Sequence, residues 1–237
     1  MLWCIAPAGA VTTEELSARL AEVEETRQLR VWASAPHPSE TELRKIAGGA
    51  VVTTLVGASG GGTSAYAGAI VPMDIGHFWA ALNDETRHPG YTAVSYSELL
   101  SGRICQSGRR VLQFLPVPML ADRWWIGVLT KNSKIMTASG GSVRELSWTS
   151  SIDPAEIGST SGQSIIAKGE PIGFTKGSWF LVALDQRSTY LEYYIKSDPG
   201  GSIPSSMASM FVTKGVRETI LAIQKFASEA TPSCPIE

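Results

Sequence analysis

The residues of this chain that could do chemistry are sparse and do not form a catalytic pattern. The three histidines, His37, His77 and His88, are scattered, and none shares a motif with a cysteine or a nucleophilic serine. No pair of histidines and no carboxylate cluster has the spacing of a metal site. Triads are assembled in space, so the sequence leaves a composite site open. It predicts no catalytic residue, no metal and no cofactor.

A glycine-rich run at residues 57–62 matches two known patterns. It contains the Gly-x-Ser-x-Gly of a nucleophile elbow, and its last residues begin like a dinucleotide-binding loop. Both patterns require a helix directly afterwards, whereas residues 64–71 look like a strand. We therefore expect a flexible hairpin here and neither chemistry.

The apolar side chains are more informative, because aromatic residues are the main lining of ligand pockets. We expect large residues from different strands to share the concave face of one sheet, although the alternative is a plain core. Seven or eight antiparallel strands curved round one helix enclose more volume than the helix easily fills, which favours a cavity. The predicted lining is Phe114, Trp125, Trp148, Trp179 (or Phe180), Leu191 and Tyr193 from strands, with Met207, Met210 and Phe211 from a C-terminal helix.

These side chains must be held by a series of strands between helices. A capping box at Thr12 and Glu15 begins a helix expected to run to about Trp32, and a short helix is expected near residues 39–46. Strands are predicted at residues 50–56, 64–71, 92–101, 109–115, 123–131, 142–151, 161–168, 174–184 and 189–196, with a short helix at 74–82 and a long one ending near Ala227. Because strands and helices do not alternate, we predict an α+β fold with helices on one face of an antiparallel sheet. The last strand alternates, so one of its faces is expected to be buried and the other wet.

Composition excludes several classes of function. The chain has 237 residues, 43% of them hydrophobic, and a net charge of −2, so no basic excess predicts a nucleic-acid partner. No apolar run reaches the roughly 18 residues of a membrane span. The three cysteines, Cys4, Cys105 and Cys234, allow at most one intramolecular disulfide and leave the redox compartment undecided. We expect a cytoplasmic protein, or an exported one if residues 1–10 are the remnant of a signal peptide.

Three segments resemble START (steroidogenic-acute-regulatory-protein-related lipid-transfer) domains. The most specific is residues 189–204, ending in Asp198-Pro199-Gly200-Gly201-Ser202-Ile203-Pro204, which is similar to the family's last strand and helix entry. Residues 76–84 are similar to its first helix, and residues 112–125 to the strand, proline-rich loop and Arg-aromatic strand that gate the pocket. Gly177-Ser178-Trp179 also fits a glycine-led strand of the family. The resemblance covers about residues 45–228.

The resemblance implies a helix-grip fold, in which a curved antiparallel sheet wraps round a long C-terminal helix, here with an extra N-terminal helix. It implies an extension at residues 1–44, a lipid-binding domain at 45–230 and a tail at 231–237. The ligand would be a lipid or sterol-like molecule, bound without chemistry and carried between membranes or partners through transient membrane contact. The implied gate is the loop at residues 116–122, with Pro116, Val117, Pro118 and Met119, facing the start of the C-terminal helix at residues 203–211. The hinge of that helix is expected at Asp198, Gly200, Gly201 and Pro204. Trp124, Trp125 and Leu129 stand where sterol-binding members often have polar residues, which puts a sterol-hydroxyl site in doubt.

Two other functions are compatible with the sequence. An aromatase/cyclase of the same superfamily, acting on a polyketide-like substrate, would need titratable residues converging in the cavity, and Arg123, Glu145 and Tyr193 are the first candidates. A ligand-sensing or scaffold module would use the helix at residues 12–32 to bind a partner. No expectation about oligomeric state follows.

Overall fold

The protein is described here from a computed structural model. It describes residues 11–33, 35–59, 62–201, 205–231 and 234, and within these ranges the side chains of residues 58–59 and 205–213 are not described.

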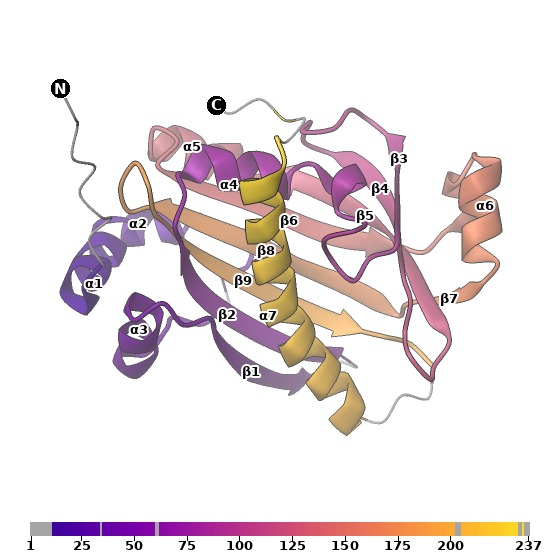
Figure 1. Cartoon of the computed structure of the whole chain (residues 1–237), viewed down its shortest axis with the longest axis horizontal. Coiled ribbons are helices and arrows are strands. Elements are labelled where there is room, and N and C mark those ends of the chain that lie inside the picture. The colour runs from indigo at the N-terminus through magenta and orange to yellow at the C-terminus, as the bar shows by residue number, and fades with distance from the viewer. Residues whose placement is uncertain (1–10, 34, 60–61, 202–204, 232–233, 235–237) are drawn as a thin grey trace.

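Nine strands of the described residues form one curved, open sheet (Figure 1). The strands are β1 (Val52–Ser59), β2 (Gly62–Val71), β3 (Tyr96–Ser101), β4 (Arg109–Leu115), β5 (Asp122–Lys131), β6 (Val143–Ser151), β7 (Gly169–Pro171), β8 (Phe174–Ala183) and β9 (Thr189–Asp198). Eight of them follow the order β1-β2-β9-β8-β6-β5-β4-β3, in which all neighbours are antiparallel. The short strand β7 lies outside this order and pairs in parallel with β5. The α+β class and the curved antiparallel sheet agree with the prediction.

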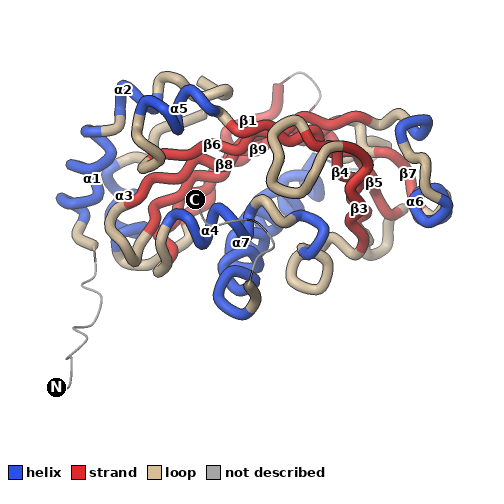
Figure 2. The backbone as a smooth tube through the Cα atoms, turned by 90° about the horizontal axis from the view of Figure 1, so that it is seen from above, coloured by secondary structure: helices blue, strands red, loops and turns tan. Residues whose placement is uncertain are grey.

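Helices cover both faces of this sheet. They are α1 (Thr13–Glu22), α2 (Glu24–Arg27), α3 (Glu40–Ala47), α4 (Ile75–Leu82), α5 (Ser133–Ala138), α6 (Thr160–Ile166) and α7 (Ser205–Glu229), with short 3-10 turns at Glu85–Arg87 and Pro154–Glu156. We call the face that carries α4 and α7 the concave face, and the opposite face, which carries α1, α3 and α5, the convex face (Figure 2). None of the described helices combines the length and apolar character needed to cross a bilayer.

The C-terminal half of α7 packs against β2 because the two surfaces are complementary in size. Ile220, Ile223 and Phe226 recur on one side of the helix and are fully buried. Opposite them, β2 presents small side chains, Ala65, Ala67 and Ala69, which let the helix approach closely. Along its length α7 contacts β2, β1, β9 and α4 on the concave face, where the ligand site is predicted.

The convex face differs from expectation, because the alternation of β9 predicted a solvent-exposed side. Tyr190 and Glu192 point to that side, yet both are fully buried. They are covered by α1 and α3, whose Leu16 and Ile46 belong to the same apolar cluster as Phe180 and Tyr190. The N-terminal helices thus pack against the body of the domain.

A buried charge network ties this N-terminal layer to the sheet. Arg27 and Arg30 both donate hydrogen bonds to the carboxylate of Glu192, and Nε of Arg30 lies 3.7 Å from Glu145. The Tyr190 hydroxyl also donates to Glu192, at 2.8 Å. Burial raises the pKa of Glu192, but the two guanidinium charges and these hydrogen bonds outweigh it and lower the pKa overall. The carboxylate is therefore ionised and depends on the N-terminal segment.

Two expected elements are corrected by the structure. Residues 161–168, expected as a strand, form α6, because the Ser159 side chain caps the Gly162 amide at 2.9 Å and the adjacent Ile165 and Ile166 break strand alternation. The helix expected to reach Trp32 is interrupted at Val23 and ends at Arg27. The helix α5 and the short parallel strand β7 were not expected from the sequence.

A disulfide joins the β3–β4 connection to the segment that follows α7. Cys105, in the β3–β4 connection, is bonded to Cys234, beyond α7, across a sequence separation of 129. The bond ties the segment after α7 to the β3–β4 hairpin. Cys4 lies outside the described residues.

Candidate ligand-binding face

An aromatic wall occupies the centre of the concave face. The ring of Tyr193 stacks on Trp179 at 4.1 Å between centroids and 15° between planes. The ring centroid of Trp148 lies 5.4 Å from that of Tyr193, with the planes tilted by 34°, and Phe78 of α4 makes an edge contact with Trp179 at 6.0 Å. Three neighbouring strands, β6, β8 and β9, thus contribute one continuous aromatic surface.

Gly177 makes the position of Trp148 possible. A Cβ at residue 177 would lie 2.6 Å from Cζ2 of Trp148 and 2.1 Å from the Tyr194 carbonyl oxygen. Neither contact is sterically allowed, so a larger residue would displace the indole. The glycine that opens the Gly-Ser-Trp segment therefore has a packing role in the aromatic wall.

Strand pairing decides which predicted lining residues share this face. Leu129 is paired with Trp148 on the concave face, and Trp125, four residues earlier on the same strand, points the same way and is partly exposed. Leu191 lies on this face too, fully buried in the core. Phe114 is a correction: it pairs with Trp124, packs with α6 on the convex face, and is separated from the wall by the sheet. The side chains of Met207, Met210 and Phe211 lie outside the described residues.

Among the described strand residues, none in the middle of the concave face is charged. Its charged strand residues lie at the two ends: Arg123 at the end near Asp198, and Arg109, Lys131 and Arg144 at the opposite end. Arg109 is fully buried and binds Glu85 and Asn83 beside α4. A ligand against the aromatic wall would meet apolar and neutral polar groups.

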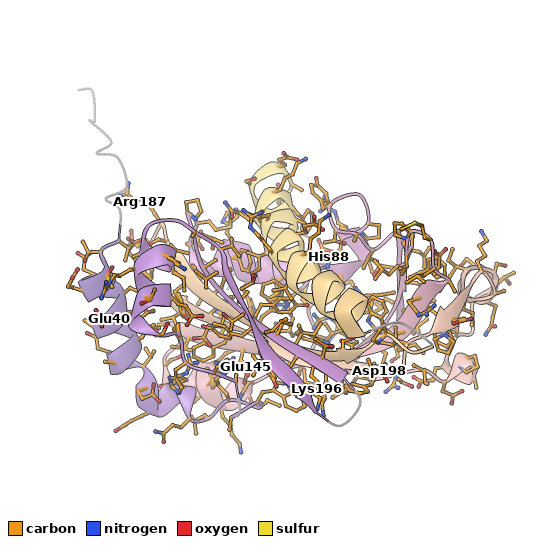
Figure 3. The ribbon with its side chains drawn as sticks, turned by 90° about the horizontal axis from the view of Figure 1, so that it is seen from below. Glu40, His88, Glu145, Arg187, Lys196 and Asp198 are labelled. Atoms are coloured by element: carbon orange, nitrogen blue, oxygen red, sulfur yellow. A yellow bond between two sulfur atoms is a disulfide. The ribbon has the colours of Figure 1, made fainter. Side chains whose placement is uncertain are left out.

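Arg123 joins the two segments predicted to form a gate. Its guanidinium donates to the Ala121 carbonyl in the loop at residues 116–121 and to the Pro199 carbonyl in the turn after β9, both at 2.7 Å. The turn is also closed locally, because the Gly200 amide donates to Asp198 at 2.9 Å (Figure 3). The two segments therefore lie side by side, through a contact that the sequence did not reveal.

The gate segments have unusual backbone and surface features. Gly200 and Gly201 have φ of 71° and 67°, a region that favours glycine. Met119, with φ of 64°, is 95% exposed at the tip of the other segment. Val117 donates its amide to Asp122 at 2.9 Å, which closes that loop, while Pro204 lies outside the described residues.

The residues that could have supported catalysis do not converge. Glu145 is buried on the convex face (Figure 3), and Arg123 hydrogen-bonds the two predicted gate segments. Of the three candidates, Tyr193 alone is part of the aromatic wall. His37 and His77 are exposed beside acidic residues. His88 is buried, lies 3.0 Å from the Ala81 carbonyl, and has its pKa lowered by burial. Among the described residues, no group of three or more potential metal ligands gathers.

Two hollows on the described surface lie away from this wall. One, of about 410 Å³, lies between α1 and α3 and is bordered by Leu20, Arg27 and Leu43. The other, of about 250 Å³, lies where β6 and β8 diverge and is bordered by Phe174, Lys176 and Lys196. Neither coincides with the predicted ligand site.

The chain resembles known proteins in structure and not in sequence. No family model matches the chain, and no curated protein matches it in sequence. A STAR-related lipid transfer protein from Xanthomonas axonopodis superposes with a TM-score of 0.57 at 18% identity, covering 75% of this chain and 99% of that one. Human STARD10 gives 0.56 at 11% identity (75% and 73% covered), and human StAR-related lipid transfer protein 5 gives 0.53 at 10% identity (92% and 98% covered). The curved sheet round α7 and these superpositions together show that the chain has a START-like helix-grip fold.

Proposed function

We propose that this protein binds one hydrophobic ligand between the concave face and α7 and carries it without chemical change. The observation that carries the proposal is the uncharged aromatic wall of Trp148, Tyr193 and Trp179 beneath the long helix. The named functions of the structurally similar proteins, lipid transfer among them, support it. Burying an alkyl chain there would contribute about 0.8 kcal/mol per methylene, so no catalytic or ionic group is needed for affinity.

Purified protein is expected to contain a co-purifying lipid and, once delipidated, to bind the neutral fluorophore N-phenyl-1-naphthylamine. Organic extraction with mass spectrometry checks the first expectation, and fluorescence titration checks the second. Trp148→Ala should weaken binding at least about ten-fold, because it removes a large apolar contact surface. The matched control is Trp32→Ala, since Trp32 lies against the Gly177 carbonyl and Lys176 outside the wall. Absence of both lipid and fluorophore binding would exclude the proposed function.

Exchange is proposed to occur where Arg123 joins the loop at residues 116–121 to the turn at 198–201. Arg123→Gln removes a charged donor from two carbonyl groups, so ligand release should become about ten-fold faster. Stopped-flow displacement of the fluorophore measures this rate. Arg110→Gln is the control, because Arg110 pairs with Glu156 away from the gate. An unchanged release rate in Arg123→Gln would argue against this gate.

The cyclase alternative receives less support from the described residues. Burial raises the pKa of Tyr193, so the phenol stays protonated near neutral pH and is suited to donate a hydrogen bond rather than to abstract a proton. The scaffold alternative also loses its motivation, because the apolar side of α1 packs on its own sheet.

The disulfide bears on the compartment. Such bonds persist mainly in oxidising surroundings. We therefore favour the exported location over the cytoplasmic one, and the membrane contact expected from the resemblance would then occur there.

A further inference from the structure

The hydroxyl of Tyr193 has no hydrogen-bond partner in the described part of the chain. The residue as a whole is 8% exposed, but its hydroxyl oxygen is not one of the fully buried, unpaired polar atoms of that part. By contrast, the neighbouring indole of Trp148 donates to Thr175 at 3.4 Å. A tyrosine hydroxyl without a protein partner is free to donate to water or to an acceptor on a ligand. Because the ring of Tyr193 is part of the aromatic wall, its hydroxyl is a candidate for contact with the ligand.

The phenol ring is held in a fixed orientation. It stacks on Trp179 at 4.1 Å between centroids and also contacts the ring of Trp148 at 5.4 Å. Its backbone lies mid-sheet, paired with Ala67 of β2 and Trp179 of β8. A donor fixed in this way loses little conformational freedom when it binds an acceptor, which favours affinity.

The surroundings of Tyr193 disfavour a charged group on the ligand. The charged strand residues of the concave face lie at its two ends, and the acidic Glu145 and Glu192 lie on the other side of the sheet. A carboxylate or phosphate placed beside the wall would be desolvated without a counter-charge, which is strongly unfavourable. Burial also raises the pKa of the Tyr193 phenol, so it donates and does not become an anion at physiological pH.

We propose that Tyr193 determines ligand specificity by donating its hydroxyl to an uncharged oxygen, such as a ketone, ester or alcohol, of an otherwise apolar ligand. This proposal rests on the proposed function and narrows its ligand class. It predicts discrimination against the hydrocarbon that lacks the oxygen and against the carboxylate that carries a charge.

The test uses three compounds of equal chain length to displace N-phenyl-1-naphthylamine from the full-length protein at pH 8: 2-dodecanone, dodecane and dodecanoate. The wild type should bind 2-dodecanone more tightly than either other compound. Tyr193→Phe keeps the stacked ring and should lose about three- to ten-fold of the ketone affinity, with dodecane affinity unchanged, as expected for one neutral hydrogen bond.

The control variant is Tyr194→Phe, because Tyr194 follows in the same strand, points to the opposite face and is also buried. Its ketone affinity should equal that of the wild type. Equal ketone affinity in Tyr193→Phe and the wild type, or dodecanoate binding as tight as the ketone, would overturn the specificity proposal while leaving hydrophobic binding intact. Failure of the fluorophore and dodecane to bind at all would instead overturn the proposed function and this inference with it.

Discussion

Replacing Glu192 by alanine is expected to lower the free energy of unfolding by about 3–5 kcal/mol. The carboxylate is fully buried and accepts hydrogen bonds from Arg27 and Arg30, so its removal leaves the buried Arg27 without a carboxylate partner and Arg30 with Glu145 alone, at 3.7 Å. Urea denaturation followed by tryptophan fluorescence measures the change. The effect should be large although the site lies on the face opposite the ligand wall.

Glu40→Ala is the control for this prediction, because Glu40 forms an exposed ion pair with Arg44 on α3. Its effect should stay within about 0.5 kcal/mol. A loss below about 1 kcal/mol for Glu192→Ala would show that the buried network contributes little. The same reasoning predicts that a chain without residues 1–40 unfolds more easily, so deleting this segment does not isolate a partner-binding role.

The network also gives a pH dependence with a definite sign. The pKa of Glu192 in the folded protein is below its ordinary value, so the unfolded chain binds this proton more readily. The stabilisation is complete above the unfolded pKa of about 4.3 and is lost as pH falls through the lower folded value. Glu192→Ala should therefore show a weaker acid-induced loss of stability than the wild type.

Removing the Cys105–Cys234 disulfide is expected to cost about 5 kcal/mol. The bond closes a loop with a sequence separation of 129, and the chain-entropy estimate for such a loop has this size. The measurement compares the free energy of unfolding of Cys4→Ser, which keeps the disulfide, with that of the triple variant Cys4→Ser/Cys105→Ser/Cys234→Ser. Cys4 is replaced in both proteins to prevent thiol exchange.

Reducing agent supplies the internal control for this prediction. It should lower the stability of the disulfide-containing protein and leave that of Cys105→Ser/Cys234→Ser unchanged. Alkylation of the wild type isolated from its native source without reduction should modify one cysteine of three, which also tests the proposed oxidising compartment. Three modified cysteines, or an unfolding midpoint indifferent to reduction, would contradict the prediction.

Local patterns in the sequence were sufficient for much of the fold. Alternation in residues 189–196 placed Leu191 and Tyr193 together on one face, and the structure has them there. The resemblance, not residue periodicity, implied a gate at the proline-rich loop, and the structure shows Arg123 joining that loop to the Asp-Pro-Gly-Gly turn. The alternation of the strand follows from residue periodicity, which acts over a few residues.

The features that the sequence did not predict depend on contacts between segments far apart in the chain. Phe114 was expected on the wall but lies on the other face, because the orientation of a strand residue depends on its pairing with β5 and not on its own alternation. The disulfide could not be assigned from three distant cysteines. That α1 and α3 pack on the sheet was likewise not evident from the sequence, because the single apolar stripe and high charge of the N-terminal segment are typical of a surface helix.

What the sequence by itself determined was the class of fold, while the ligand site and the gate remain predictions. Only the tertiary structure decided that Arg27 and Glu192, 165 residues apart, neutralise one another, and that Tyr193 alone of the three candidate polar residues faces the aromatic wall. The physical reason is that burial and pairing of charge depend on which surfaces meet in the folded chain, and no local pattern encodes that choice.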